Sequence, residues 1–358
     1  MPAPTAELHA MGQSLWLDNI TRKMLDDGVI QHYIDECSVT GLTSNPSIFD
    51  KAVSGGFYDD AIREKSAAGL AGEDLFFELA IEDLRRAADA FRPIHEATAG
   101  VDGFVSLEVS PELAYDTEST VKAASDLHAR ADRPNLFIKI PGTAEGLPAI
   151  TETIASGVPV NVTLLFDAAQ YRAAAEAYMA GIEKRIEAGE DPVVESVASV
   201  FMSRWDKAVA DNAPAELKDR LALAVGGRVY RTYREVLDSD RWKRLEGAGA
   251  RPQRLLWAST STKDPEASDT LYVSGLAAPN TVNTMPDGTL EAFHDHGTLD
   301  GAMDPAGGNC EEDLAAFESA GIDVDALAAQ LQSDGAQAFV DSWKDLMERV
   351  EAQAGAVG

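Results

Sequence analysis

The sequence predicts a single α/β domain folded as an eight-stranded (β/α)8 barrel of the TIM type. Short apolar stretches alternate with longer stretches of helical periodicity from near the start of the chain to about residue 276, and there are eight apolar stretches. Repeated β–α units imply parallel strands, and eight such units imply a closed barrel. A doubly wound open sheet is the alternative, but no glycine-rich phosphate turn follows the first apolar stretch.

The expected strands share the β-branched and aliphatic composition of buried sheet residues. In chain order they are residues 14–19, 38–45, 103–109, 135–140, 158–166, 194–201, 254–260 and 270–276. Helical periodicity is clear over 73–97 and 168–188. The strand at 135–140 reads "NLFIKI", so a lysine stands within an apolar run.

Three segments are longer than a minimal β–α unit requires. We expect extra helices around 50–100 and 204–247, and two or three amphipathic helices in 309–358 that pack on the barrel. Residues 277–308 are rich in Gly, Pro, Asp and Thr, which predicts a long loop. We expect residues 1–358 to form one domain, because no linker separates two.

The charge balance limits the partners of the protein. With 30 basic and 60 acidic residues, the formal net charge is −30. Such a surface repels nucleic-acid phosphates and anionic membranes, so we expect neither as a partner. The start of the chain lacks a signal-peptide pattern and no stretch approaches 18 apolar residues, so we expect a cytoplasmic protein. An anionic substrate must then be bound locally by Arg or Lys.

No metal or organic cofactor is expected. Cys37 and Cys310 are far apart and belong to no CxxC motif. His294 and His296 flank an aspartate, but no third ligand follows at metal spacing, so we interpret them as part of a polar loop.

Polar residues stand at the ends of seven of the expected strands, where the active-site groups of barrels project. In the third, fourth and fifth strands they alternate with aliphatic residues, so they face the barrel interior. The set is Asp18, Thr43, Asn45, Glu108, Lys139, Asn161, Thr163, Ser199 and Ser259. Each residue alone is more simply a satisfied core group or a solvated strand end, but seven strands together favour an active site.

The residue types indicate a particular chemistry. Burial of Lys139 favours the neutral amine, which can attack a carbonyl carbon and form a Schiff base. The resulting iminium accepts the electrons of a neighbouring C–C bond. Glu108 and Asp18 are the available acid/base pair, one for forming and hydrolysing the iminium and one for the hydroxyl that becomes an aldehyde. Amide and hydroxyl groups such as Asn45, Asn161, Thr163 and Ser199 suit the hydroxyls of a polyol. This set is typical of a class I aldol reaction on a sugar.

A phosphate site is expected beside these residues. Arg204 opens a helix after the sixth strand, where a guanidinium and helix N-terminal amides can clamp a phosphate. Arg228, Arg231 and Lys263 are further candidates, and a solvated charge is the alternative for each.

The sequence resembles the transaldolase family, in its longer bacterial form. The matching motifs run in order along most of the chain: "LWLDNI", "GLTSNPSIF", "VSLEVSP", "IKIPGT", "VNVTLLF", "SVFMSR", "LLWASTSTKDP" and "DTLYVSGLAAPNTVNTMP". The resemblance implies transfer of a dihydroxyacetone unit between sedoheptulose 7-phosphate and glyceraldehyde 3-phosphate, giving erythrose 4-phosphate and fructose 6-phosphate. It implies sugar phosphates as partners, no cofactor, and a monomer or homodimer.

The resemblance also assigns roles. Lys139 matches the Schiff-base lysine, Glu108 the acid/base that works through a catalytic water, and Thr163 the hydroxyl that holds this water. Asp18 matches the acid/base on the substrate C4 hydroxyl.

The family's substrate-binding positions are carried over in the same way. They correspond to Thr43, Asn45, Asn161, Ser199, Arg204 and Ser259.

One position departs from the family. Many members carry an arginine two residues after the serine equivalent to Ser259, and this chain has Ser261 there, with Lys263 beyond it. A fructose 6-phosphate aldolase-like lyase is the alternative function, but such relatives generally use a tyrosine for the proton transfer that Glu108 would perform.

Overall fold

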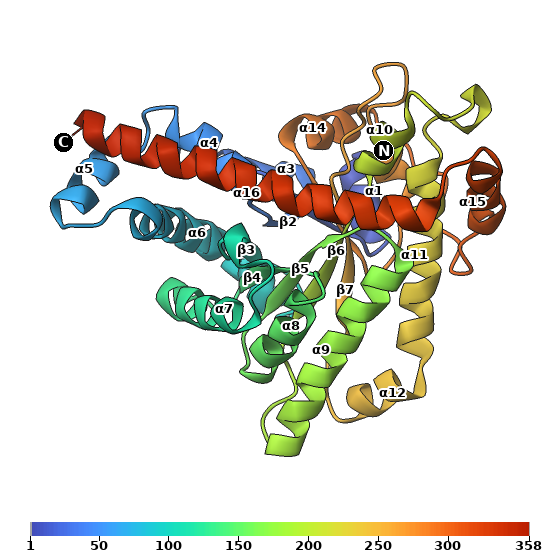
Figure 1. Ribbon diagram of the computed structural model, residues 1–358, viewed down its shortest axis with the longest axis horizontal. Helices are drawn as coiled ribbons and strands as arrows, with labels where there is room; N and C mark the ends of the chain where they lie inside the picture. The colour runs from blue at the N-terminus through green and yellow to red at the C-terminus, as the bar shows by residue number, and fades with distance from the viewer. Residues whose placement is uncertain (1, 358) are drawn as a thin grey trace.

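The computed structural model describes residues 2–357 and contains a barrel of eight parallel strands surrounded by helices (Figure 1). The hydrogen-bonded order is β2-β1-β8-β7-β6-β5-β4-β3. The strands are β1 (Ser14–Leu17), β2 (Val39–Leu42), β3 (Val105–Glu108), β4 (Leu136–Pro141), β5 (Val160–Leu165), β6 (Ser196–Phe201), β7 (Arg254–Ala258) and β8 (Val282–Met285). The predicted fold class is confirmed.

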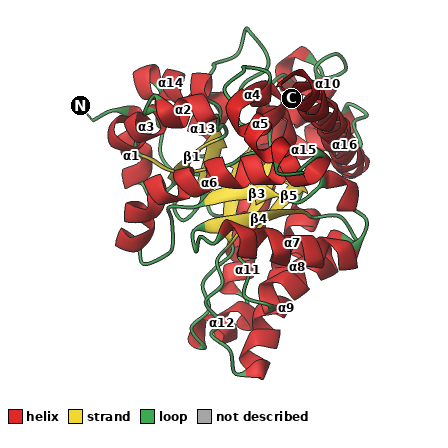
Figure 2. Cartoon of the chain, turned by 90° about the vertical axis from the view of Figure 1, so that its left-hand side faces the viewer, coloured by secondary structure: helices red, strands yellow, loops and turns green. Residues whose placement is uncertain are grey.

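Helices enclose the strands on several sides, as Figure 2 shows. The first half of the chain contains α1 (Pro4–Ala10), α2 (Arg22–Asp26), α3 (Val29–Cys37), α4 (Pro46–Val53), α5 (Asp59–Ala67), α6 (Gly72–Ala97), η1 (Pro111–Leu113), α7 (Thr117–Ala131), α8 (Gly146–Ala155) and α9 (Ala168–Ala188). The second half contains α10 (Ser203–Val209), η2 (Ala215–Leu217), α11 (Leu221–Asp238), α12 (Asp240–Gly247), α13 (Leu271–Gly275), α14 (Asp287–His296), α15 (Cys310–Ser319) and α16 (Val324–Val357). The extra helices expected around 50–100 and 204–247 are present.

The eighth strand was predicted in the wrong place. Residues 270–276 contain α13, in which Tyr272 and Val273 are buried, so their apolar character reflects helix burial. The eighth strand is instead β8, which lies inside the segment expected to be a loop and pairs with β1 and β7. Short apolar runs do not distinguish a buried strand from a buried helix, which explains the error.

The rest of the expected loop 277–308 is also partly helical. α14 follows β8 directly and contains His294 and His296 in its last turn, so the polar-loop interpretation of these histidines was wrong. His294 Nδ1 lies 2.9 Å from Thr5 Oγ1, and His296 Nε2 lies 3.0 Å from Asp269 Oδ1. These contacts join α14 to neighbouring segments.

The seam between β2 and β3 is where the barrel is joined least regularly. These strands stand at the two ends of the strand order, and their backbone link is the bond from Leu42 N to Phe104 O, at 3.0 Å. Gly41 allows the close approach, because a Cβ there would lie 2.6 Å from Phe104 O and 2.7 Å from Trp16 Nε1.

The N-terminal end of the barrel is filled by a buried polar network. Asp102 accepts hydrogen bonds from Trp16 Nε1 at 2.8 Å and from Gly103 N at 2.9 Å, and Arg254 Nη1 lies 3.9 Å from its carboxylate. The opposite end, where the strands finish, is left for the site.

The C-terminal segment, in which two or three helices were predicted, contains two, α15 and α16. α16 is long, and Figure 1 shows it crossing the molecule in red beside α4 and α6. Gln332 donates to Leu164 O at 3.0 Å and to Gly142 O at 3.1 Å, which fixes the helix to the ends of β4 and β5. α16 thus packs over the C-terminal ends of the strands.

Replacing Gly41 with Ala should destabilise the protein by about 1–3 kcal/mol, because the added methyl overpacks the seam against Phe104 and Trp16. Urea unfolding of the variant measures this loss. Gly288→Ala is the matched control, since nothing lies within 4 Å of its added Cβ. Equal stability of the two variants would contradict a tightly packed seam.

Candidate active site

A cavity of ≈ 340 Å³ opens at the C-terminal ends of the strands. Eight of the predicted site residues line it: Asp18, Thr43, Asn45, Lys139, Thr163, Ser199, Arg204 and Ser259. The other two, Glu108 and Asn161, lie directly behind this wall. Seven strands or the segments that follow them therefore contribute to one place, as parallel strands of a barrel require.

Lys139 projects into the barrel interior from β4. Register pairs place it beside Glu108 of β3 and Asn161 of β5, so the three side chains share one layer. Its side chain is 6% exposed, and its Nζ lies 3.0 Å from Ser44 O and 3.4 Å from Glu108 Oε2. The amine is thus held at the base of the cavity with two acceptors on one side.

Glu108 has the environment of an acid/base group. Burial raises its pKa above the ordinary value, Lys139 acts in the opposite direction, and Asp18 adds to the rise. Its Oε1 and the hydroxyl of Thr163 are buried and have no hydrogen-bond partner among the described residues. These two oxygens retain unused hydrogen-bonding capacity beside Lys139.

Asp18 follows β1, which β2 separates from Glu108 on β3. Burial raises its pKa, while Lys139 and the hydrogen bond from Thr43 oppose the rise. Thr43 Oγ1 lies 2.8 Å from Asp18 Oδ1 and 2.7 Å from Thr284 Oγ1. The threonine therefore fixes the carboxylate and links it to β8.

The predicted amides and hydroxyls differ in how they are used. Asn161 does not line the cavity: its Nδ2 donates to Ser106 Oγ at 3.2 Å and its Oδ1 accepts from Ser199 Oγ at 2.7 Å. Asn45 caps α4, where its Oδ1 accepts from Ile48 N at 3.2 Å, which leaves its amide nitrogen for a ligand. Ser259 Oγ lies 2.9 Å from the Oγ of Ser203, which is the first residue of α10.

Cations gather at one side of the cavity. Arg204 lies in the first turn of α10 with its guanidinium 4.9 Å from the ring centre of Phe201 and 6.0 Å from that of Phe339. Burial lowers the pKa of Arg204, and no carboxylate lies within ion-pair distance of it in the described part of the chain. Partial burial, followed by repulsion from Lys207 and Arg204, lowers the pKa of Lys263. An anion placed here would relieve this repulsion.

Ser261 and Lys263, which the sequence analysis considered for the phosphate site, line the cavity. Sequence reasoning missed the other lining residues, which are Ser47, Ile48, Lys51, Phe201, Ala258, Thr284, Pro286 and Phe339. Phe339 comes from α16, and its ring centre lies 6.0 Å from Lys139 Nζ. The amphipathic pattern of α16 indicates that Phe339 is buried, but it does not identify the surface it covers.

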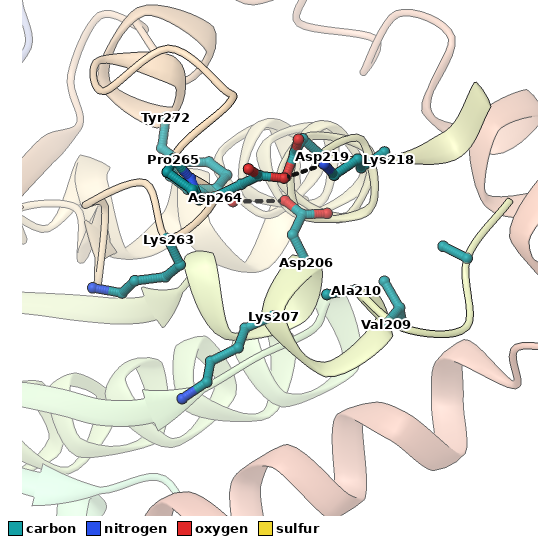
Figure 3. A pocket seen from close by; sticks show the side chains of 11 residues that line it. Asp206, Lys207, Val209, Ala210, Lys218, Asp219, Lys263, Asp264, Pro265 and Tyr272 are labelled. Atoms are coloured by element: carbon teal, nitrogen blue, oxygen red, sulfur yellow. Dashed lines mark hydrogen bonds and ion pairs between the residues drawn. The ribbon is translucent and has the colours of Figure 1, made fainter. Parts of the chain in front are cut away.

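A second cavity of ≈ 320 Å³ lies next to the first and shares Lys263 with it (Figure 3). Figure 3 shows the Lys263 and Lys207 side chains extending to one side, away from Asp264 and Asp219. Asp206 is occupied there by structural contacts, since it accepts from Tyr272 Oη at 2.8 Å and from Leu221 N at 2.9 Å. Three aspartates balance three lysines in this lining, so it suits an anion less well than the first cavity does.

Residues 2–357 contain no group of three or more His, Cys, Asp or Glu side chains arranged to hold a metal ion. Nor does any helix in this range combine the length and the apolar character that crossing a membrane requires.

A barrel that holds a buried lysine beside one carboxylate, with a second carboxylate lining the same cavity, has the arrangement typical of Schiff-base aldol enzymes. Comparison with known proteins gives the family. Residues 15–350 match the family model described as "Transaldolase/Fructose-6-phosphate aldolase", so the chain belongs to this family. The resemblance seen in the sequence motifs is confirmed.

Named relatives are similar over nearly their full length. "Transaldolase" of Thermobifida fusca (strain YX) is 46% identical, covering 99% of this chain and 100% of the relative. "Transaldolase" of Saccharopolyspora erythraea is 47% identical over 96% of this chain and 95% of the relative. "Transaldolase 2" of Streptomyces coelicolor is 44% identical with the same coverage.

Asp18→Asn should stabilise the protein at neutral pH, because it removes a carboxylate that burial disfavours. Since the folded pKa of Asp18 is raised above an unfolded value of about 3.9, wild type loses stability as the pH rises from that value through the folded pKa. The advantage of the variant should grow across this interval and vanish below it. Urea unfolding at a series of pH values measures the difference.

Asp89→Asn is the control of opposite sign, because the hydrogen bond from Arg133 lowers the pKa of Asp89. This variant should lose stability relative to wild type as the pH rises, by less because the pair is exposed. The same pH trend in both variants would show that burial does not dominate at Asp18.

Proposed function

We propose that this protein is a transaldolase, which transfers a dihydroxyacetone unit from sedoheptulose 7-phosphate to glyceraldehyde 3-phosphate through a Schiff base on Lys139. The products are erythrose 4-phosphate and fructose 6-phosphate. The observation that carries the proposal is the Lys139 amine, buried at the base of a polar cavity and 3.4 Å from Glu108. The family and the named relatives support the same reaction class.

The reaction begins when the neutral Lys139 amine attacks the substrate carbonyl carbon. Glu108 is the group that moves protons as the carbinolamine loses water, and burial raises its pKa, which favours the protonated form that donates to the leaving oxygen. The unpartnered Thr163 hydroxyl and Glu108 Oε1 can hold the water that leaves and later returns. Formation and hydrolysis of the iminium thus use one wall of the cavity.

Asp18 acts on a different part of the substrate. It takes the proton of the substrate C4 hydroxyl as the C3–C4 bond breaks, so that the hydroxyl carbon leaves as an aldehyde and the electrons remain as an enamine on Lys139. Thr43 keeps Asp18 in place during this step through their 2.8 Å hydrogen bond. The reverse sequence with a new aldehyde completes the transfer.

Substrate binding is assigned to the remaining lining groups. Asn45 and Ser199 would bind hydroxyls directly. Asn161 does not line the cavity, and its role here is to orient Ser199 through their 2.7 Å hydrogen bond. Arg204 and Ser259 would hold the phosphate, with Lys263 as the second cation because Ser261 cannot supply one.

The fructose 6-phosphate aldolase-like alternative is not favoured. The relatives compared above bear the name transaldolase, and a carboxylate, Glu108, occupies the position beside the lysine. The expectations of a cytoplasmic location and of a monomer or homodimer remain predictions.

Borohydride reduction in the presence of fructose 6-phosphate should attach a stable adduct to Lys139, which peptide mass mapping detects. Lys139→Ala should abolish the adduct and lower kcat by several orders of magnitude, since no other buried amine lines the cavity within residues 2–357. Lys122→Ala, on the exposed face of α7, is the control that should retain both. An adduct at another residue would defeat the mechanism, and free dihydroxyacetone as the main product would favour the aldolase.

Arg204→Ala and Lys263→Ala should each weaken the binding of fructose 6-phosphate about tenfold or more, because each removes a charged hydrogen bond to phosphate. The measurement is the concentration dependence of borohydride trapping. Unphosphorylated fructose is the internal comparison, and its trapping should change little. An equal loss with both sugars would argue against a phosphate clamp.

A further inference from the structure

Ser44 closes the seam between β2 and β3 with its side chain. The ladder rung from Leu42 N to Phe104 O is followed, two residues further along each strand, by a bond from Ser44 Oγ to Ser106 O at 2.8 Å. In a regular parallel ladder, the next donor along this seam would be a backbone amide. Here the donor is the side-chain hydroxyl of Ser44. Ser44 is 1% exposed and Ser106 is fully buried, so solvent does not compete for this bond.

The carbonyl of the same residue contacts the amine of Lys139. Ser44 O accepts from Lys139 Nζ at 3.0 Å, a shorter distance than the 3.4 Å to Glu108. Ser44 does not line the cavity, so this contact lies behind the face that a substrate meets. Ser44, which follows β2, therefore contacts β3 through its hydroxyl and β4 through its carbonyl.

We propose that Ser44 is a positioning residue for Lys139: its hydroxyl anchors the peptide at the seam, and its carbonyl holds the amine so that the nitrogen lone pair faces the cavity. The inference rests on the proposed function, because it concerns the Schiff-base step.

Proton counting gives the carbonyl a role throughout this step. The neutral amine has two N–H bonds, which fit the acceptors Ser44 O and Glu108 Oε2. When the C–N bond forms and the substrate oxygen leaves as water, that oxygen carries away one proton from the amine and one from Glu108. The protonated iminium keeps a single N–H, which the carbonyl of Ser44 can accept. Glu108, now a carboxylate, is then free to receive a proton.

The anchor continues into the substrate-binding side of the barrel. Ser106 Oγ accepts from Asn161 Nδ2 at 3.2 Å, and Asn161 Oδ1 accepts from Ser199 Oγ at 2.7 Å. All of these groups are buried. A shift of the Ser44 peptide would therefore be opposed by strands on both sides of Lys139.

The test compares Ser44→Ala with Thr40→Val. Thr40 is a matched control in β2, the strand that Ser44 follows: its buried hydroxyl also donates to a carbonyl of a neighbouring strand, Leu15 O at 3.4 Å, but it does not contact Lys139. Ser44→Cys, with a thiol that is a weaker donor in nearly the same volume, gives an intermediate case. For each variant, kcat, KM and the rate of borohydride trapping with fructose 6-phosphate are measured, together with stability in urea.

Ser44→Ala should lower kcat and the trapping rate by roughly ten- to hundredfold, the effect of misplacing a reacting group by about 1 Å. KM should stay within about twofold because Ser44 does not line the cavity. Thr40→Val should keep the wild-type kcat, and Ser44→Cys should fall between wild type and Ser44→Ala.

Wild-type kcat in Ser44→Ala, or an equal loss of kcat in Thr40→Val, would overturn the proposal. If Ser44→Ala does not fold, Ser44→Cys decides, since unchanged kcat in that variant also overturns it. A wild-type protein that forms no adduct on Lys139 would instead contradict the proposed function, so the two failures are distinguishable.

Discussion

The register between β3 and β4 places an amine and a carboxylate side by side in the barrel interior, and the chemistry of the site depends on this pair. Lys139 and Glu108 are register partners and are both about 5% exposed. Removing two such groups from water is costly, and their attraction repays the cost only in part. A large barrel with an extensive core can bear this cost, and burial in it raises the pKa of Glu108 above that of an exposed carboxyl.

The positive charge that could bind an anion is concentrated at one cavity. The chain as a whole carries a net charge of −30, yet Arg204, Lys51 and Lys263 line one cavity. Screening in salt shortens the range of the surface charges to about 10 Å, whereas a partly buried cation such as Arg204 keeps its influence on a bound anion. Aromatic faces replace carboxylates as neighbours of Arg204, so its charge stays available.

Sequence alone was sufficient where local pattern and function coincide. The alternation in "FVSLEV" and "LFIKI" identified β3 and β4 and the inward side chains Glu108 and Lys139, and the structure brings them together. It failed for β8, whose four residues include the buried polar residues Asn283 and Thr284 and so lack an apolar signature. Phe339 could not be assigned to the site because it reaches the cavity through a long-range packing contact. Likewise, the bond between Lys139 and Ser44 crosses 95 positions of the chain, a relation that no local period encodes.

The order of elements along the chain also affects biosynthesis. Asp18 follows the first strand and Phe339 belongs to the last helix, so segments from near the two ends of the described chain meet in one cavity. A ribosome that has completed all eight strands still has α16 to make, and until then Phe339 is missing from its place beside Lys139 and Arg204. Because a domain folds as a unit, the wall of the cavity is complete only once this last helix has been made. Catalytic competence therefore requires nearly the whole chain, although most site residues belong to earlier segments.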